Sequence, residues 1–170
     1  IKPKRSIVFM TFTGEERGLL GSKYFVKNPT TGSMKKIVAM INMDMIGRYD
    51  KDRLSIGGAG TSPIFKKLIE DHAEGTGLDY RMSDSGVAPT DSTSFYYEDV
   101  PVLFYFTGIH KQYHTPDDDV HLVNKPGALL ILNHVLNMTV SLADHEKEIG
   151  FVKAEGLRLG ITLDQQAGMG

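Results

Sequence analysis

The chain has 170 residues, with 19 basic and 21 acidic side chains, so its formal net charge at pH 7 is −2. This near balance gives no support for a basic nucleic-acid-binding face, and we expect no nucleic-acid partner. An apolar content of 41% argues against intrinsic disorder, and no apolar run approaches the ~18 residues that predict a membrane-spanning helix. Cysteine is absent, so any metal would be held by His, Asp and Glu side chains.

The apolar pattern predicts strands and helices that alternate along the chain. Near-continuous or short apolar runs predict strands at residues 6–13, 36–46, 54–56, 79–83 and 100–107. Apolar residues at helical spacing predict helices at 18–27, from 62 to a glycine at 75 or 77, at 94–98 and at 126–148. This order indicates an α/β fold: a mostly parallel central sheet with helices on both faces.

The last predicted helix, 126–148, is apolar enough to pack against the sheet along one stripe. We expect the stripe to contain Leu129, Leu132, Val135, Leu136, Thr139, Val140 and Leu142. Its two histidines, His134 and His145, are expected to be partly buried or to face solvent. The residues before it, 108–123, read as a long polar loop.

Polar side chains follow three of the predicted strands. Glu15 and Glu16 come after the first strand, Asp44 lies near the end of the second, and His114 follows the strand that ends at Thr107. In open α/β sheets ligands bind beyond the carboxyl ends of the strands, so these side chains are candidates for a common site. Taken singly, each also fits an ordinary role in a turn, a helix cap or the surface.

Asp44 interrupts an otherwise apolar strand, and an unpaired buried carboxylate is costly. A positive charge is therefore expected beside it. One interpretation is an ion pair with Arg48 or Arg17, and the other is a metal cation, for which carboxylates and imidazoles are common ligands.

Three motifs in this order resemble the di-zinc aminopeptidase family. They are residues 12–22 (FTGEERGLLGS), 42–47 (NMDMIG) and 113–117 (YHTPD). The resemblance covers about residues 6–148 and implies a zinc-dependent enzyme that removes N-terminal residues from peptide substrates. Two cations about 3.5–4 Å apart would activate a bridging water and hold the carbonyl oxygen.

The resemblance also implies a role for each matching residue. Glu15 would be the general base, Glu16 and His114 would bind one zinc ion, and Asp44 would bind the other. The Tyr113 hydroxyl would stabilise the oxyanion. Residues 90–92 (TDS) lie where such enzymes often have Ser-Asp-His, so Asp91 is expected to be structural or to contact a ligand residue.

The sequence departs from the family pattern before Glu15. The family has a further His and a metal-bridging Asp upstream, and residues 1–14 contain neither. The remaining histidines do not match: His72, His110, His121, His134 and His145. We therefore expect this chain alone to bind zinc weakly or not at all and to be inactive, whereas a longer parent protein would be the enzyme.

The ends of the chain suggest an excerpt from a longer protein. An apolar strand begins within a few residues of Ile1, and residues 157–170 resemble the opening of a PDZ domain. We expect residues 1–150 to be the C-terminal part of a zinc exopeptidase domain and 151–170 to be a linker and the start of a PDZ domain. A sheet edge left open by truncation predicts self-association.

Two alternatives on the same scaffold remain at this point. One is a carboxypeptidase or glutaminyl-cyclase-like enzyme, for which no basic pocket is recognisable. The other is a non-catalytic domain like that of the transferrin receptor. The presence of Glu15, Glu16, Asp44 and His114 argues against this alternative. By analogy with similar proteins we expect a periplasmic or extracellular location.

Overall fold

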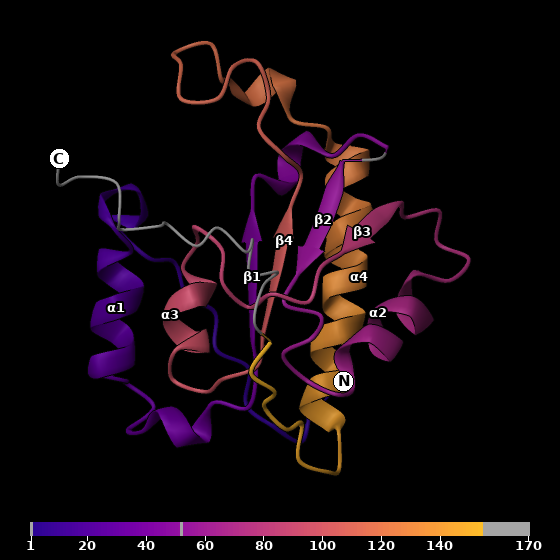
Figure 1. Ribbon diagram of the computed structural model, residues 1–170. Coiled ribbons are helices and arrows are strands. Elements are labelled where there is room, and N and C mark those ends of the chain that lie inside the picture. Colours follow the sequence, from indigo (N-terminus) through magenta and orange to yellow (C-terminus); the bar gives the residue numbers. More distant parts are fainter. Residues whose placement is uncertain (1, 52, 155–170) are drawn as a thin grey trace, which may run out of the picture.

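The structure is a computed structural model that describes residues 2–51 and 53–154 (Figure 1). Its sheet has four strands: β1 (Met40–Asp44), β2 (Leu54–Gly57), β3 (Tyr80–Met82) and β4 (Val102–Phe106). The strand order is β1-β4-β2-β3. The β1–β4 and β2–β3 pairings are parallel and the β2–β4 pairing is antiparallel, so the sheet is mostly parallel, as predicted.

Helices cover both faces of this sheet, which confirms the predicted α/β architecture (Figure 1). The α-helices of residues 2–51 and 53–154 are α1 (Leu20–Lys27), α2 (Phe65–Ala73), α3 (Ser92–Tyr96) and α4 (Lys125–Asp144). The described residues also form single-turn 3₁₀ helices between the longer elements or before them: η1 (Glu15–Arg17), η2 (Met34–Lys36), η3 (Ile46–Arg48) and η4 (Val120–Leu122). In Figure 1, α1 and α3 lie on one side of the sheet, and α2 and α4 on the other.

Strand β4 separates two hydrophobic cores because its side chains alternate between the two faces. Leu103 and Tyr105 belong to the larger core, which also contains buried residues of α2 and α4. Val102 belongs to the smaller core with Phe25 of α1 and Phe95 of α3. The end of β4 is therefore held firmly from both sides.

The prediction of a buried strand at residues 6–13 is wrong for the described structure. These residues belong to no strand of the sheet, and Val8 and Phe9 are 53% and 89% exposed. Only Phe12 joins the interior, where its ring lies 5.9 Å from that of Phe95. An apolar run favours burial, but a strand also requires a neighbouring backbone as hydrogen-bonding partner.

The predicted buried stripe of α4 is only partly correct. The buried side chains are Ile131, His134, Val135, Met138, Leu142 and Ala143. By contrast, Leu129, Leu132 and Leu136 are 57%, 44% and 56% exposed. Nearly every side of this helix is apolar, so the pattern alone could not identify the face that packs on the sheet.

Histidine 134 lies fully inside, contrary to expectation, because both ring nitrogens have partners. Its Nδ1 lies 3.1 Å from Tyr105 Oη, and its Nε2 lies 3.1 Å from the Ile69 carbonyl oxygen. The helix also ends at Asp144, four residues early, where the Arg5 guanidinium donates to the Leu142 and His145 carbonyl oxygens.

By length and composition α4 could cross a membrane, and 39% of its apolar window is buried in the fold. Core helices share this property, so it is weak support for a membrane span, and the expected absence of one stays a prediction.

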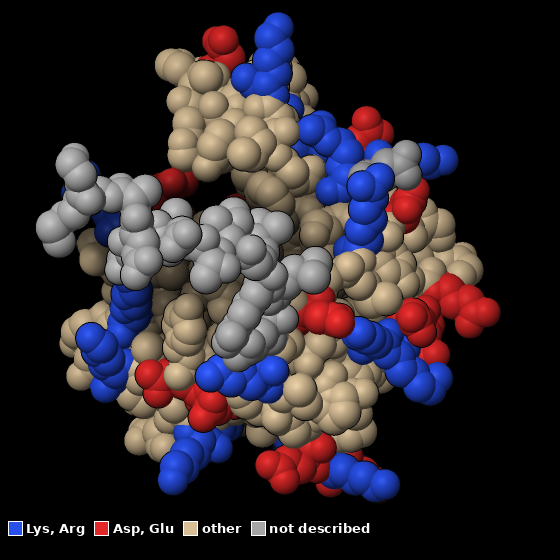
Figure 2. All heavy atoms as spheres, in the orientation of Figure 1, with Lys and Arg blue, Asp and Glu red and all other residues tan. Residues whose placement is uncertain are grey.

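The described residues after α4 pack against the domain. The Phe151 ring lies 5.5 Å from that of Tyr96, and the Val152 N–H donates to the Thr61 carbonyl oxygen at 2.8 Å. The stretch that resembles a PDZ domain lies outside the described residues. On the face drawn in Figure 2, basic and acidic side chains are interspersed around the rim.

Candidate active site

Glycines shape the turn that carries Glu15 and Glu16. Gly14 has a φ of 66°, a left-handed conformation that glycine adopts without strain, and it leads directly into η1. Gly21 lets α1 approach the preceding chain, because a Cβ there would lie 2.8 Å from the Thr13 backbone nitrogen. The Gly21 N–H donates to the Thr13 carbonyl oxygen at 2.9 Å. The glycine-rich motif thus folds tightly and presents two adjacent carboxylates.

Asp44 is the last residue of β1, and the chain turns sharply after it. Met45 has a φ of 55°, which is rare for a residue with a side chain. The Met45 carbonyl oxygen accepts a hydrogen bond from Thr107 Oγ1, a fully buried residue after β4. The carboxyl ends of β1 and β4 are thereby joined, and Asp44 is held half-buried above them.

Tyr113 and His114 lie in the loop between β4 and α4, which rises above the carboxyl ends of β1 and β4 at the top of Figure 1. Their rings stack with centroids 3.7 Å apart and an interplanar angle of 20°. His114 has a left-handed φ of 56°. Its Nε2 lies 2.7 Å from Glu16 Oε1, so the loop after β4 contacts the turn before α1.

The electrostatics of these groups show that they share one region. Burial raises the pKa of Glu15, and the carboxylates of Glu16, Asp91 and Asp44 raise it further. Burial also raises the pKa of Asp44. A hydrogen bond from the Met45 backbone lowers this pKa, whereas the carboxylates of Glu16 and Asp91 raise it further. Several negative charges therefore face one another.

The ion pair considered for Asp44 is absent from the described part of the chain. Arg48 instead pairs with Asp118, with 2.5 Å between Nη2 and Oδ1. Across residues 2–51 and 53–154, no basic side chain lies within ion-pair distance of Asp44. The first of the two interpretations of Asp44, an ion pair with Arg48 or Arg17, is therefore not what the described residues show.

Asp91 is a further acidic residue at this site, and sequence reasoning gave it no direct role. It is 8% exposed, and its Oδ1 has no hydrogen-bond partner among the described residues; the same holds for the Ser92 hydroxyl. The hydrogen bond of 2.7 Å from Asn42 Nδ2 to Thr90 Oγ1 ties this segment to β1, two residues before Asp44. In the sequence, Asp91 was indicated by the TDS stretch at 90–92, which lies where related enzymes often have Ser-Asp-His but lacks the histidine.

The donor set fits a divalent cation such as zinc, which takes carboxylate oxygens and imidazole nitrogens. Glu16 and His114 touch, and Asp44 and Asp91 add carboxylates whose charges act on Glu15. In the described residues, however, no three His, Asp or Glu side chains are already grouped closely enough to hold a metal. The buried Asp91 Oδ1, which has no hydrogen-bond partner among the described residues, is an acceptor that a nearby positive charge would satisfy.

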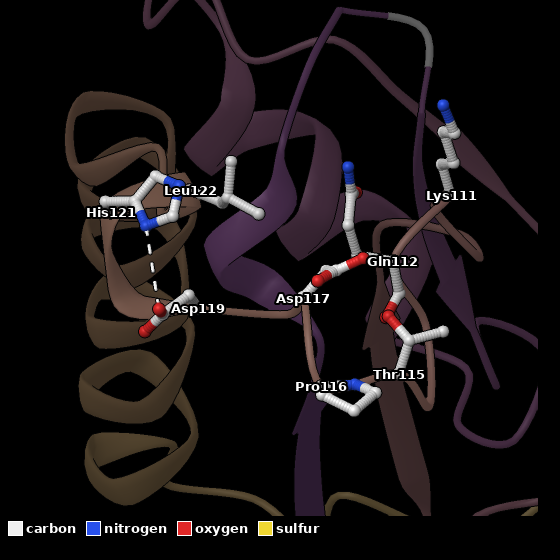
Figure 3. A pocket seen from close by; sticks show the side chains of 8 residues that line it. All are labelled: Lys111, Gln112, Thr115, Pro116, Asp117, Asp119, His121 and Leu122. Carbon is white, nitrogen blue, oxygen red and sulfur yellow. Dashed lines mark hydrogen bonds and ion pairs between the residues drawn. The ribbon is translucent and has the colours of Figure 1, made fainter.

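A separate cavity of about 430 Å³ lies farther along the loop between β4 and α4 (Figure 3). It is lined by Lys111, Gln112, Thr115, Pro116, Asp117, Asp119, His121 and Leu122. The dashed line in Figure 3 joins His121 Nδ1 to Asp119 Oδ2 at 3.8 Å. None of the five predicted site residues lines this cavity, so it is distinct from the site above β1 and β4.

Comparison with known sequences gives a family and several relatives. Residues 1–139 match peptidase family M28. An aminopeptidase of Pseudomonas aeruginosa is 33% identical over 107 residues, covering 51% of this chain and 20% of the relative. Leupeptin-inactivating enzyme 1 of Streptomyces exfoliatus is 28% identical over 115 residues, covering 64% of this chain and 24% of that enzyme.

Solved structures agree with this family at the level of the fold. BSAP, a zinc aminopeptidase from Bacillus subtilis, gives a TM-score of 0.67 at 22% identity, over 85% of this chain and 38% of that one. The LapA aminopeptidase of Legionella pneumophila gives 0.65 at 20% identity, over 80% of this chain and 38% of that one. The chain thus spans a quarter or less of these curated relatives and under two fifths of the solved aminopeptidases.

The resemblance inferred from three short motifs is confirmed by this match, which extends over residues 1–139 of 170. The fold is consistent with it, as shown by the solved aminopeptidases to which this chain is similar. The chain belongs to peptidase family M28.

Proposed function

We propose that this chain supplies part of the active site of a zinc-dependent aminopeptidase that removes N-terminal residues from peptides. The observation that carries the proposal is the 2.7 Å contact between His114 Nε2 and Glu16 Oε1, two predicted metal ligands 98 residues apart in sequence. Relatives named aminopeptidase and a solved zinc aminopeptidase support the reaction class. Their names lend no support to a carboxypeptidase, a glutaminyl cyclase or a receptor.

In this proposal Glu16, His114 and Asp44 hold zinc, which when bound supplies Lewis-acid activation of water and of the scissile carbonyl. Glu15 is adjacent to Glu16 and half-buried, so its carboxylate accepts a proton and returns it to the leaving nitrogen. The Tyr113 hydroxyl, beside the same carboxylates, donates a hydrogen bond to the oxyanion that develops at the carbonyl oxygen.

The number of metal ions and the remaining ligands belong to the proposal as well. We infer two zinc ions in the complete gene product that contains this chain, with a His and an Asp supplied from outside residues 1–170. The described residues bring Glu16 and His114 into contact and leave Asp44 outside a three-ligand group. The 170-residue chain alone is therefore proposed to bind zinc weakly and to be inactive.

Two carboxylate variants of the complete gene product test this division of roles. Glu15→Gln should lower turnover of leucyl and alanyl amides by about 10²–10⁴-fold and leave the zinc content unchanged, because a general base is lost but no ligand. Glu16→Gln should lower the zinc content itself. Zinc is measured by elemental analysis and turnover by chromogenic assay with and without a chelator.

Two outcomes would count against the proposal. Hydrolysis that persists after the chelator has removed all zinc would exclude a metal-dependent reaction. Equal loss of zinc in both variants would mean that Glu15 and Glu16 do not have separate roles. Exposed Glu98, which follows the end of α3, is the matched control, and Glu98→Gln should change neither quantity.

We also propose that the isolated chain self-associates. Four consecutive apolar residues, 7–10, are all exposed, from 37% for Ile7 to 89% for Phe9. Strand β1 is an edge strand of the described sheet and carries the exposed Met43. Open strand edges and exposed apolar segments favour pairing with another chain.

A further inference from the structure

A cluster of charged side chains, Arg48, His110 and Asp118, joins the loop between β4 and α4 to η3. Asp118 uses both carboxylate oxygens: Oδ1 is 2.5 Å from Arg48 Nη2, and Oδ2 is 3.5 Å from His110 Nε2. The side chains of Arg48 and His110 are only 15% and 7% exposed. None of these three residues belongs to the proposed ligands or to the general base.

This cluster fastens both ends of a short segment that contains Tyr113 and His114. His110 stands before the segment and Asp118 after it, so their contact closes the loop upon itself. Within it, the Tyr113 N–H donates to the His110 carbonyl oxygen at 3.0 Å, and the Asp118 N–H donates to that of Thr115 at 3.2 Å. The segment is thus a compact turn rather than an open loop.

Arg48 then fixes this compact turn relative to the sheet. It ends η3, four residues after Asp44, and therefore belongs to the chain that leaves β1. The ion pair with Asp118 spans 70 residues of sequence and links the Asp44 side of the site to the Tyr113–His114 side. An arginine hydrogen bond to a carboxylate is charge-assisted and directional, which suits it to fixing an orientation.

Contacts between rings connect the Arg48–His110–Asp118 cluster to the proposed site. The His110 ring meets the Tyr113 ring edge-on, with centroids 6.4 Å apart at 85°. Tyr113 in turn stacks on His114, whose Nε2 contacts Glu16. The left-handed φ of 56° at His114 is a conformation that a non-glycine residue keeps only when its surroundings enforce it.

We propose that Asp118, held by Arg48 and closed onto His110, is a positioning residue that keeps the Tyr113 and His114 rings stacked and directed at Glu16. Its effect on catalysis rests on the proposed function, whereas its effect on loop geometry does not. Asp118 is 39% exposed, so we expect the Arg48–Asp118 pair to contribute less to global stability than a fully buried ion pair would. The consequence of breaking it is therefore local.

Nuclear magnetic resonance of the 170-residue chain tests the local effect without any metal. In the unaltered chain we expect nuclear Overhauser contacts between the Tyr113 and His114 rings and slowed exchange of the Tyr113 amide hydrogen. Asp118→Asn keeps the shape of the side chain and removes its charge. It should weaken the ring contacts and speed amide exchange on the order of tenfold, as loss of a charge-assisted hydrogen bond implies.

Three further variants separate positioning from a general structural effect. Arg48→Ala should reproduce the part of the Asp118→Asn effect that depends on the Arg48–Asp118 pair, and the double variant should be no worse than Asp118→Asn alone, because that variant already removes this pair. Asp84→Asn breaks the exposed Lys66–Asp84 ion pair of 2.8 Å, remote from this loop in sequence, and should leave the ring contacts unchanged. The melting temperature should stay nearly constant throughout.

The outcomes distinguish this inference from the proposed function. Unchanged ring contacts in Asp118→Asn and Arg48→Ala, or additive effects in the double variant, would overturn the positioning role. If the contacts weaken and kcat of the complete, zinc-loaded gene product falls while KM is kept, both proposals are supported. If the contacts weaken and the gene product never hydrolyses an aminoacyl amide, the positioning role stands and the aminopeptidase function fails.

Discussion

At the residue scale, two backbone conformations determine where the proposed ligands point. Met45, directly after Asp44, and His114 itself both have positive φ values. Such conformations cost about 1–3 kcal/mol for residues with a side chain and cluster at functional sites. Here they turn the chain at the ends of β1 and after β4, so that a carboxylate and an imidazole face the same region.

Asp91 gives a prediction about charge at this site. Replacing it with Asn removes the charge of a buried carboxylate whose Oδ1 has no partner among the described residues, so the metal-free chain should gain about 1 kcal/mol of unfolding free energy in urea titrations. The pKa of Glu15 should also fall toward its ordinary value, because the Asp91 charge helps to raise it. Carbon-13 NMR titration measures this pKa. A loss of stability, with an unchanged pKa for Glu15, would show that Asp91 is paired and remote.

The sequence indicated where the candidate site lies, but it did not identify every residue that belongs to the site. Glu15, Glu16, Asp44, Tyr113 and His114 lie in motifs whose spacing is local, so they could be recognised along the chain. Asp91 and Asp118 could not be assigned in this way. Their surroundings come from β1, η3 and the loop after β4, and no single stretch of sequence contains those contacts.

At the element scale, α4 illustrates why a helix can be predicted while its buried face is not. Its length and apolar content come from local residues, whereas the packed face depends on what α2 and the sheet offer. Tyr105 and Ile69 supply partners for both nitrogens of His134, so this polar residue is buried and three leucines are exposed. The same holds for residues 6–13, because an apolar run does not specify which strand it would pair with.

The buried His134 makes the stability of the fold depend on pH. Burial lowers its pKa below the ordinary 6.5, with His72 acting in the same direction and the hydrogen bond to Ile69 opposing them. The folded chain thus holds the ring neutral, while the unfolded chain binds a proton below about pH 6.5. Its contribution to stability is complete above that pH and declines as the pH falls toward the folded-state pKa.

Urea unfolding between pH 8 and pH 5 tests this effect. The unaltered chain should lose stability below about pH 6.5, and His134→Gln should lose less over the same range, because glutamine does not titrate. Histidines that do not interact with His134 contribute equally to both proteins and cancel in the difference. Identical pH dependences in the two proteins would mean that His134 titrates in the folded state as it does in the unfolded one.

At the scale of the whole molecule, the exposed 7–10 segment predicts association between chains. Val8→Asp should shift the 170-residue chain toward monomer in light scattering coupled to gel filtration, because a charge at an apolar contact opposes burial. Val87→Asp is a matched control, since Val87 is 45% exposed against 53% for Val8. A chain that is already monomeric at high concentration, or equal effects of both variants, would contradict the proposal.

The central claim is that residues from η1, β1 and the loop after β4 together hold a pair of neighbouring zinc ions in one site. Anomalous diffraction at the zinc edge from crystals of the complete gene product tests it most directly. We expect zinc within about 2.0–2.2 Å of Glu16, His114 and Asp44 donor atoms, with Glu16 and His114 on one ion and Asp44 on its neighbour. Zinc bound elsewhere, or Asp44 pointing away from every zinc ion, would contradict it.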